Sequence, residues 1–516
     1  MRIIDFFDRG CSFFPDRPFL MDEHVTLSHR EVQDMSHRIV NGLIDGGLTP
    51  GKSVVGVLSP NNPRAFQCVM GALRSFLWLP LNARNSVADH IAILSDQGCE
   101  CLFYHSDFAH EVNQIRRETP GIKQFICVDQ DGGKDLFLDS WAARYSTISP
   151  YLPRQPQDVS VIWPTGGTTG RSKGVLTTHL NWETMISSFF AAMPYSEPPV
   201  HLVAAPMTHA AGVVIFALMG IGVTNVFMSR ADPLKIAANI QKHRITTIFL
   251  PPTAIYSLLA APGIRDFDYS SLKYFIYAAA PMSAEKLKLA IEVFGPVMAQ
   301  TFGQAESPMI CCYLSPTDHN VSGDPEKERH LSSCGRPSMF TQVEIMDDNG
   351  NILAPEAKGE IVVRGNLVSL GYNNNPEATE EIRRFGWHHT RDVGFKDRDG
   401  YVYIVDRKND MIISGGFNLY PNEIEQVIWS HPEVQDCAVI GVPDEKWGEA
   451  VKAVIELKPG SRVQETELLA FCRERLGGLK CPKSVEIWSE LPRSPVGKVL
   501  KKDIRQKFWA GRTRNI

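Results

Sequence analysis

The sequence lacks several features that would assign a functional class directly. None of its eleven cysteines forms a C-x-x-C pair, and no other cysteine spacing matches a zinc site. The 53 basic and 58 acidic residues give a net charge of −5, so no basic excess points to nucleic acid as a partner. We therefore expect a soluble globular protein of a reducing compartment, the cytoplasm, with mostly buried thiols.

The first residues do not have the pattern expected of a signal peptide either. The N-terminus, MRIIDFFDRG, is interrupted by Asp5, Asp8 and Arg9, which excludes a signal peptide. One charge-free run, 210–228, has the length of a membrane span. Glycines interrupt this run, so we predict a buried helix, a glycine turn and a short strand, and no stable membrane insertion.

At 516 residues the chain is too long for one hydrophobic core. Up to about residue 300, short apolar β-rich runs alternate with helical patterns, which is typical of parallel sheets covered on both faces. Two hairpin signals follow, Asn349-Gly350 and Asp399-Gly400, and they predict a small antiparallel, barrel-like unit.

Strand and helix patterns intermix after this unit, which predicts a separate small domain. The predicted fold is α/β. Residues 1–405 form two doubly wound, parallel-type sheets plus the antiparallel unit, and residues 406–516 form a small mobile α+β domain.

One glycine-rich stretch, PTGGTTGRSKG (164–174), indicates phosphate binding. Threonine hydroxyls and glycine amides can converge on phosphate oxygens, and a lysine adds a point charge. The spacing is not that of the Walker loop, because Arg171 and Ser172 separate Gly170 from Lys173. The alternative is a surface loop without a ligand, but apolar strand-like runs on both sides favour a ligand loop.

Further stretches accompany this loop in a fixed order. They are PMTHAAG (206–212), AAAP (278–281), FGQAE (302–306), GWHHTRD (386–392), DRKNDMIISGGFNLYPNEIE (406–425) and LPRSPVGK (491–498). Together they resemble the adenylate-forming superfamily, which includes acyl-CoA synthetases, firefly-type luciferases and peptide-synthetase adenylation domains. The resemblance covers essentially the whole chain, and the joint match is specific although each motif alone is weak.

The resemblance implies roles for individual residues. Lys498 is implied to bridge the substrate carboxylate and the α-phosphate, where its cation would stabilise developing charge. Lys173 and Glu306 complete the catalytic set, with Glu306 as ligand of Mg²⁺, an ion that takes hard oxygens and bridges phosphates. The implied ATP and AMP contacts are Thr165, Gly166, Gly167, Thr168, Thr169, Gly170, Lys173, Ala280, Pro281, Phe302, Gly303, Asp392 and Arg407.

The resemblance also implies an acyl pocket and a coenzyme A face, with Asp406 as the hinge between the two domains. The implied pocket residues are His209, Gly212, Tyr277, Ala278 and Ala279, and the bulk of the last three is expected to select a slim or short substrate. The implied coenzyme A contacts are Gly415, Gly416, Trp447 and Gly448, where two glycines let a pantetheine arm pass close to the backbone.

YAAAP (277–281) departs from the Ser-Gly-Gly-Ala-Pro that is usual in the superfamily, and four further positions depart from its pattern. Gly166 replaces the usual serine, Ser172 a proline, Ala305 a threonine and Arg391 a glycine. A lost hydroxyl contact to a phosphate costs about 1.5–3 kcal/mol, so a weak ATP site or a catalytically silent homologue is an alternative. The charged residues of the implied site are all retained, which favours an active enzyme.

The sequence therefore predicts an AMP-forming carboxylate–CoA ligase that uses ATP, Mg²⁺ and coenzyme A. The expected substrate is an aromatic or short- to medium-chain aliphatic acid, because MTHAAGVVIF is apolar. An enzyme that loads a carrier protein is the second hypothesis. The sequence does not define the oligomeric state; a homodimer is an expectation only.

Overall fold

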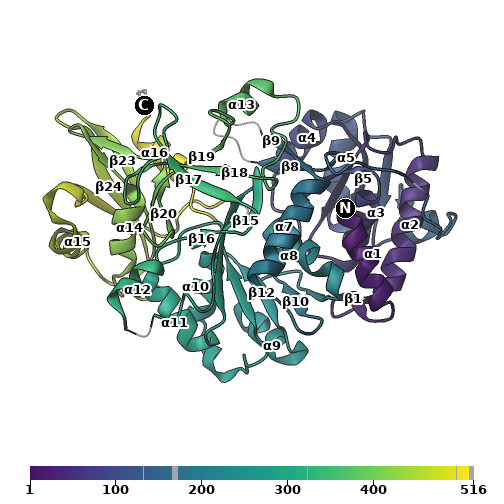
Figure 1. Ribbon diagram of the computed structural model, residues 1–516, viewed down its shortest axis with the longest axis horizontal. Helices are drawn as coiled ribbons and strands as arrows, with labels where there is room; N and C mark the ends of the chain where they lie inside the picture. Colours follow the sequence, from purple (N-terminus) through teal and green to yellow (C-terminus); the bar gives the residue numbers. More distant parts are fainter. Residues whose placement is uncertain are drawn as a thin grey trace.

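The computed structural model describes residues 1–131, 133–150, 152–165, 172–321, 323–408, 410–494 and 497–510 (Figure 1). The largest sheet has the order β16-β15-β14-β13-β12-β10-β11-β1-β2 and is parallel from β14 to β1. Its strands are β1 (Pro18–Met21), β2 (Thr26–Ser28), β10 (Val200–Val203), β11 (Thr224–Phe227), β12 (Thr247–Leu250), β13 (Tyr274–Tyr277), β14 (Met298–Gln304), β15 (Ser307–Leu314) and β16 (Arg336–Pro337).

A second sheet of seven strands has the order β7-β6-β5-β3-β4-β8-β9. It is parallel except for the edge pair β8–β9. Its strands are β3 (Val54–Ser59), β4 (Leu77–Asn82), β5 (Cys99–Tyr104), β6 (Gln124–Cys127), β7 (Leu136–Phe137), β8 (Val159–Thr165) and β9 (Lys173–Thr178). In both large sheets, an antiparallel strand pair follows the parallel part: β8–β9 in the second sheet and β14–β15 in the largest.

Helices fill the space between the two large sheets and cover their outer faces (Figure 1). They are α1 (Ile3–Phe13), α2 (His29–Asp45), α3 (Pro63–Leu73), α4 (Val87–Asp96), α5 (Ala109–Glu118), α6 (Leu138–Ala142), α7 (His179–Ala192), α8 (Ala210–Leu218), α9 (Pro233–His243), α10 (Pro252–Ala260), α11 (Ala284–Phe294) and α12 (Pro325–His330). Helix α9 starts as its sequence predicts: Asp232 accepts a hydrogen bond from the Lys235 amide, and Pro233 occupies the first turn.

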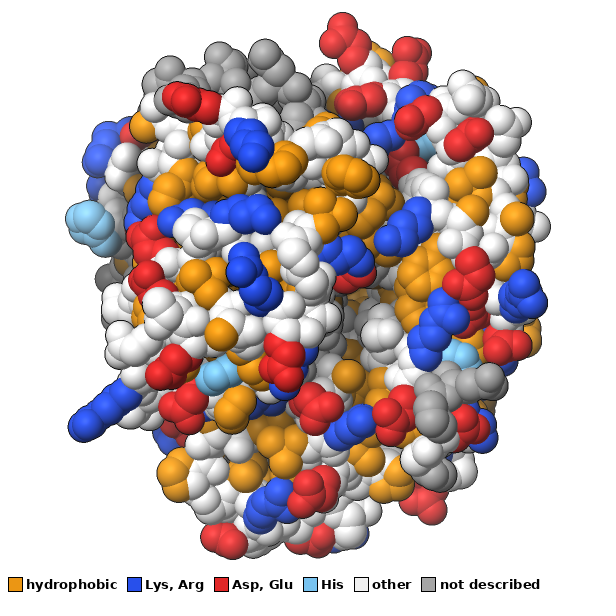
Figure 2. All heavy atoms as spheres, turned by 90° about the vertical axis from the view of Figure 1, so that its left-hand side faces the viewer, with side chains coloured by type: hydrophobic (Ala, Val, Ile, Leu, Met, Phe, Trp, Pro, Cys, Tyr) orange, Lys and Arg blue, Asp and Glu red, His pale blue; other side chains and the backbone are white. Residues whose placement is uncertain are grey.

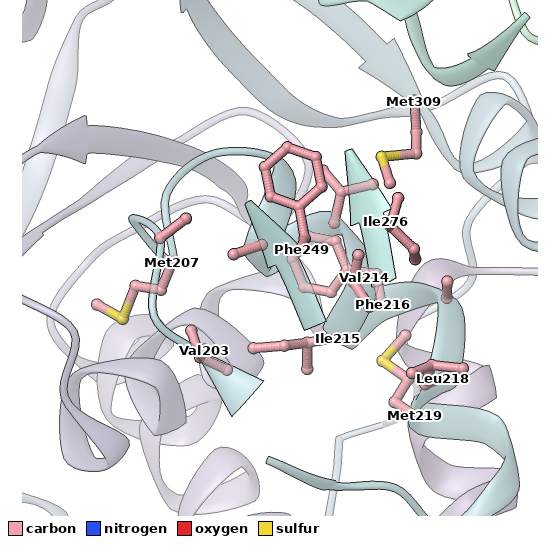
Figure 3. Packing of buried hydrophobic residues seen from close by; sticks show 14 of the residues in the cluster. Val203, Met207, Val214, Ile215, Phe216, Leu218, Met219, Phe249, Ile276 and Met309 are labelled. Atoms are coloured by element: carbon pink, nitrogen blue, oxygen red, sulfur yellow. The ribbon is translucent and has the colours of Figure 1, made fainter. Parts of the chain in front are cut away.

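Aromatic side chains join the two sheets in one continuous core. Phe216 of α8 packs edge-on against Trp78 of β4 and Trp182 of α7, at ring-centroid distances of 5.7 and 5.4 Å. Figure 3 shows the same helix packed against Phe249 of β12 and Ile276 of β13. Burial of these rings explains why the charge-free run around α8 is hydrophobic on all sides.

That run folds as predicted from its glycines. Helix α8 ends in a short 3₁₀ turn, Met219–Ile221, and Gly222 adopts the left-handed conformation before β11 (φ 76°). In the described part of the chain, no helix combines the length and the apolar character that crossing a membrane requires.

A third, antiparallel sheet contains β17 (Gln342–Met346), β18 (Gly359–Arg364), β19 (His388–Lys396) and β20 (Val402–Arg407) in sequential order. The predicted hairpin at Asp399-Gly400 joins β19 to β20, and Gly400 has a φ of 85°. The predicted hairpin at Asn349-Gly350 forms a tight turn, but its return arm pairs through one bridge, Met346↔Ile352. The main partner of β17 is β18.

The last sheet has its own hydrophobic clusters. Helices α14 (Pro421–Trp429) and α15 (Glu465–Lys480) pack on one face and α16 (Lys501–Phe508) on the other. Its strands are β21 (Ile412–Ser414), β22 (Phe417–Leu419), β23 (Val434–Asp444), β24 (Gly448–Leu457) and β25 (Ser484–Trp488). Figure 2 shows this side of the molecule, where acidic, basic and hydrophobic side chains are interspersed.

The predicted α/β fold class is confirmed: two mainly parallel sheets are followed by an antiparallel sheet and a C-terminal α+β unit. The predicted domain boundary, 405/406, lies within the last residues of β20, and α13 (Pro376–Glu381) precedes β19. All eleven cysteines are free and buried.

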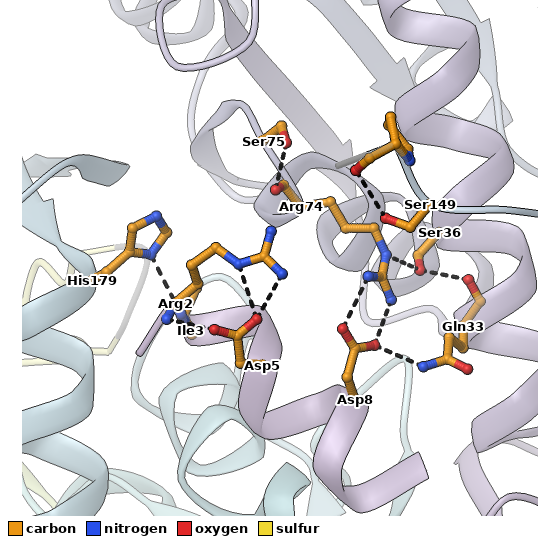
Figure 4. A network of polar contacts seen from close by, with 11 residues as sticks. Arg2, Ile3, Asp5, Asp8, Gln33, Ser36, Arg74, Ser75, Ser149 and His179 are labelled. Atoms are coloured by element: carbon orange, nitrogen blue, oxygen red, sulfur yellow. Dashed lines mark hydrogen bonds and ion pairs between the residues drawn. The ribbon is translucent and has the colours of Figure 1, made fainter. Parts of the chain in front are cut away.

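A buried ion pair fastens the N-terminal helix to the second sheet's helices (Figure 4). Arg74 follows α3, and its side chain is 3% exposed. It donates to both carboxylate oxygens of Asp8 at 2.7 and 3.1 Å and to Ser36 at 2.6 Å, while Gln33 also donates to Asp8. Burial alone would raise the pKa of Asp8, but the contacts to Arg74 outweigh it and hold that pKa below 3.8.

We expect Asp8→Ala to lower the free energy of unfolding by about 3 kcal/mol, because the buried Arg74 would lose its counter-charge. Urea unfolding followed by tryptophan fluorescence measures this. Asp16→Ala is the control, since Asp16 and Arg30 form an exposed pair at 3.4 Å.

The lowered pKa of Asp8 also sets the sign of a pH effect. The stabilisation is present above pH 4 and is lost as pH falls through the folded-state pKa. Equal losses of stability in the Asp8 and Asp16 variants would contradict the assignment.

Candidate active site

The predicted phosphate loop is held at its base by the edge hairpin β8–β9. Thr165 pairs with Lys173, its hydroxyl donates to the Lys173 carbonyl at 3.2 Å, and the Ser172 hydroxyl donates to the Thr165 carbonyl at 2.9 Å. The loop residues Gly166, Gly167, Thr168, Thr169 and Gly170 lie outside the described residues. Their phosphate contacts stay a prediction.

A tight turn between β14 and β15 carries Glu306. Gly303 allows this turn, because a Cβ there would lie 2.7 Å from the backbone of Met309. One oxygen of the Glu306 carboxylate, Oε1, accepts a hydrogen bond of 2.6 Å from the hydroxyl of Tyr372. The Lys173 ammonium lies 4.9 Å from the centre of the Tyr372 ring. The two predicted catalytic side chains from different sheets therefore meet at one tyrosine.

Asp392 lies buried on β19 beside the same turn. The side chain of Gln304 at the end of β14 donates to its Oδ2 at 2.8 Å, and Arg407 of β20 contacts its Oδ1 at 2.7 Å. Burial raises the pKa of Asp392, while the charges of Arg407 and Lys498 oppose that rise. The structure thus brings the predicted Asp392 and Arg407 to the end of β14, the strand that also carries Phe302 and Gly303.

Lys498 belongs to the C-terminal unit and is exposed. It lies close enough to Asp392 and Arg407 for its charge to interact with theirs. Partial burial and the nearby Arg407 lower its pKa, and Asp392 opposes this effect. The preceding residue, Gly497 (φ 86°), approaches α10, since a Cβ there would lie 3.1 Å from the Thr253 hydroxyl.

The predicted hinge residue, Asp406, is buried at the end of β20. Its Oδ2 accepts a hydrogen bond of 2.8 Å from the Asn422 amide in the first turn of α14. That carboxylate faces the positive end of the helix and replaces a missing N-cap side chain. The buried ion pair between Lys501 and Glu425, at 2.8 Å, holds α16 to α14.

The predicted acyl-pocket residues lie at the start of α8 and at the end of β13 and just after it. His209 precedes α8 and lies edge-on to Trp163 of β8, at a ring-centroid distance of 6.5 Å. Burial lowers the pKa of His209 to about 4, so the ring is neutral near pH 7. Gly212 is required by packing, because a Cβ there would lie 1.9 Å from the Met207 carbonyl oxygen.

Ala278, Ala279 and Ala280 directly follow β13; Ala279 is exposed, like Pro281 after this segment. Ala279 adopts a φ of 75°, a conformation that disfavours residues with a Cβ. The Cβ of Ala279 therefore adds both bulk and backbone strain at this position.

The predicted pocket role of Tyr277 is corrected by the structure. Its fully buried hydroxyl contacts Gln300 at 3.0 Å and His319 at 2.9 Å. Alternate residues of a strand point to opposite faces, so Tyr277 shares the face of Phe275, which packs on α11. Ile276 instead points toward α8 (Figure 3). Tyr277 is a core residue on the other side of the sheet.

The predicted coenzyme A residues form one surface feature of the C-terminal unit. Gly415 and Gly416 turn the chain from β21 to β22 with φ values of 59° and 82°. The Gly415 amide donates to the Trp447 carbonyl at 2.8 Å, and a Cβ at Gly415 would lie 2.6 Å from the Trp447 ring. Trp447 is 41% exposed and precedes Gly448 (φ 76°).

The donor set fits magnesium bound together with phosphates. In the described part of the chain, no three His, Cys, Asp or Glu side chains cluster to hold an ion. Mg²⁺ keeps several waters and commonly takes one or two carboxylates plus substrate phosphates. Glu306, half-buried at the turn next to Lys173, can supply that one carboxylate.

Comparison with known proteins now gives the family. The sequence matches the AMP-binding enzyme family over residues 7–373 and the AMP-binding enzyme C-terminal domain over residues 423–498. The chain belongs to the AMP-binding enzyme family. This result confirms the predicted membership of the adenylate-forming superfamily.

Relatives and solved structures agree with this assignment. The medium/long-chain-fatty-acid–CoA ligase FadD8 of Mycobacterium tuberculosis is 35% identical over 97% of this chain and 89% of its own length. A feruloyl-CoA synthase of Amycolatopsis sp is 34% identical over 97% of this chain and 99% of its own length. The amide bond synthetase McbA of Marinactinospora thermotolerans has a TM-score of 0.88 at 25% identity, covering 98% of this chain and 100% of McbA.

The sequence patterns did not identify three residues that contact the predicted site residues of this AMP-binding enzyme. Gln304 holds Asp392, Tyr372 joins Glu306 to Lys173, and Trp163 faces His209. Gln304 lies within FGQAE (302–306), and Trp163 directly precedes PTGGTTGRSKG (164–174). Their positions in the sequence could therefore have identified them as site residues. Tyr372 follows Gly371 in a segment that no quoted motif covered.

We expect Asp392→Asn to weaken AMP binding about ten-fold or more, since a charge-assisted hydrogen bond contributes about 1.5–3 kcal/mol. The variant keeps the shape but removes the charge that Arg407 contacts. Isothermal titration calorimetry with AMP measures the change. Asp399→Asn, an exposed carboxylate on the same hairpin, is the control. Unchanged AMP affinity in Asp392→Asn would rule out the assignment.

Proposed function

We propose that this AMP-binding enzyme is an AMP-forming carboxylate–CoA ligase. The observation that carries the proposal is the contact between Arg407 and Asp392 beside the Glu306 turn, where the charge of Lys498 also acts on both groups. In the first step a carboxylate oxygen of the acid attacks the α-phosphorus of ATP, and pyrophosphate leaves. In the second step the coenzyme A sulfur attacks the acyl carbon, AMP leaves, and the thiol proton passes to solvent.

Different residues of the site bind or stabilise different charged groups in the first step. The Lys498 cation stabilises the charge that develops between the carboxylate and the α-phosphate. Asp392 binds the ribose hydroxyls, and Arg407 fixes its orientation. Lys173 and the loop before it bind the β- and γ-phosphates. Mg²⁺, held by Glu306, would neutralise phosphate charge when bound.

The second step uses the other face of the C-terminal domain, residues 406–516. Gly415, Gly416 and Gly448 line a backbone surface without side chains, and Trp447 lies at its edge. A rotation about Asp406 exchanges the Lys498 face for this face. The separate hydrophobic clusters on the two sides of the boundary support independent movement of the domains.

The substrate is a carboxylic acid with an apolar body, either aromatic or short- to medium-chain aliphatic. Trp163, the neutral His209 and the apolar helix α8 offer rings and aliphatic surface. The relatives named as fatty-acid and feruloyl ligases support this range and favour coenzyme A over a carrier protein or a silent homologue. Free cysteines suit the cytoplasm; a homodimer stays a prediction.

We expect Lys498→Ala to lower carboxylate-dependent exchange of pyrophosphate into ATP by about a hundred-fold or more, since one electrostatic donor is lost. Conversion of a supplied acyl-adenylate to acyl-CoA should remain near the wild-type rate. Lys502→Ala, an exposed lysine on α16, is the control. Undiminished exchange in Lys498→Ala would refute its role.

We expect Trp447→Ala to raise the KM for coenzyme A about ten-fold while the pyrophosphate exchange is unchanged, because an exposed aromatic contact contributes about 1–2 kcal/mol. Steady-state kinetics with coenzyme A and with a phosphopantetheinyl carrier protein measure this. Leu479→Ala, another exposed apolar residue of this domain, is the control. A wild-type KM for coenzyme A, or a preference for the carrier, would contradict the proposal.

A further inference from the structure

Residues 369–373, SLGYN, form a strap that binds both edges of the proposed ATP site. Backbone hydrogen bonds pair the strap with β9: the Leu176 amide donates to Gly371 at 2.8 Å, and Val175 forms an antiparallel bridge with Tyr372. At its other end, the Ser369 amide donates to the carbonyl of Glu306 at 2.7 Å. The strap therefore ties the strand after the phosphate loop to the Glu306 turn.

Helices on either side anchor the strap and the residues just before it. The Asn181 side chain of α7 donates to the carbonyls of Asn366 and Val368 at 2.8 and 2.9 Å. On the other side, the Tyr372 amide donates to the hydroxyl of Thr379 in α13 at 2.9 Å. The backbone around Tyr372 is thus constrained from both directions, so its side chain has a defined orientation.

One side chain of the strap contacts both charged groups of the site. The Tyr372 hydroxyl donates to Glu306 Oε1 at 2.6 Å, and the ring lies beneath the Lys173 ammonium at 4.9 Å. The hydroxyl contact is charge-assisted and involves one of the two carboxylate oxygens. The ring contact lies within the range of a cation–π interaction.

We propose that Tyr372 is a positioning residue that fixes the Glu306 carboxylate for magnesium–nucleotide binding and steadies Lys173 beside it. This inference rests on the proposed function, in which Glu306 and Lys173 contact the magnesium–ATP complex. A hydrogen bond to one carboxylate oxygen stops rotation of the group and holds the other oxygen in one direction. The chain thereby orders the metal-binding carboxylate before the nucleotide arrives.

Two substitutions separate the hydroxyl from the ring. Tyr372→Phe removes the hydroxyl and keeps the ring, so we expect Mn²⁺ binding to the protein–nucleotide complex to weaken about ten-fold, with binding of metal-free AMP unchanged. Tyr372→Leu removes both contacts and should weaken the metal–nucleotide complex further. Electron paramagnetic resonance of Mn²⁺, with α,β-methylene-ATP as the nucleotide, measures the affinity without turnover.

Tyr104→Phe is the matched control. Its hydroxyl donates to the Asp135 carboxylate at 2.8 Å. Tyr104 lies on β5 of the second sheet, where three strands, β3, β4 and β8, separate it from β9. This variant should leave Mn²⁺ affinity at the wild-type value. Thermal unfolding of both phenylalanine variants shows whether either loses its fold. If Tyr372→Phe unfolds, Glu306→Asp replaces it in the test, because the shorter side chain withdraws the carboxylate from the Tyr372 hydroxyl. Mn²⁺ affinity of Glu306→Asp is then compared with that of the wild-type protein. An unchanged affinity refutes the positioning role.

Glu306→Gln separates the failure of this inference from that of the proposed function. Weakened Mn²⁺ binding in Glu306→Gln with wild-type binding in Tyr372→Phe would overturn the positioning role alone. Wild-type Mn²⁺ binding in Glu306→Gln would overturn the metal assignment on which the inference rests. If both single variants weaken binding, the double variant should be no weaker than Glu306→Gln, because Tyr372 acts through Glu306.

Discussion

The buried carboxylate of Asp392 is the contact on which the arrangement of the site depends. It accepts a hydrogen bond from Gln304 of the largest sheet and forms an ion pair with Arg407 of the antiparallel sheet. It also interacts with the charge of Lys498 from the C-terminal unit. A buried carboxylate without such partners would be strongly destabilising. The same group that seats the nucleoside in the proposal therefore also fixes how three parts of the chain meet.

The topology explains why the chemistry collects at this place. Each large sheet is parallel along most of its width, and in each a connection between antiparallel neighbours follows the parallel part: from β8 to β9 in one sheet and from β14 to β15 in the other. The phosphate loop and Glu306 occupy these two connections. Tyr372 bridges them from a segment that pairs with β9, so two sheets supply one site.

Much of this was predictable from local sequence patterns. The alternation of apolar strands and amphipathic helices predicted the parallel sheets, and the glycines at 220 and 222 predicted the break after α8. Motif order placed Asp392 and Arg407 in one site. The predictions could not include Tyr372, because its importance comes from pairing between residues about 200 positions apart. The error at Tyr277 arose because a motif position does not reveal which face of a strand a side chain occupies.

Two departures from the superfamily pattern gain a physical meaning in the structure. Arg391, where glycine is usual, has a φ of 61°, and Ala279, in the segment usually rich in glycine, has a φ of 75°. Both residues carry a Cβ in a conformation that favours glycine. Arg391 has compensating contacts, an ion pair with Glu381 at 2.7 Å and an amide hydrogen bond to Glu360.

The central claim is that the acid is activated by attack on the α-phosphorus of ATP. Turnover with a carboxylic acid labelled with ¹⁸O in both carboxyl oxygens, followed by mass spectrometry of the products, tests it most directly. The account predicts one ¹⁸O atom in AMP, none in pyrophosphate, and an acyl-CoA that keeps the other label. Label in orthophosphate together with ADP, or AMP without label, would contradict it.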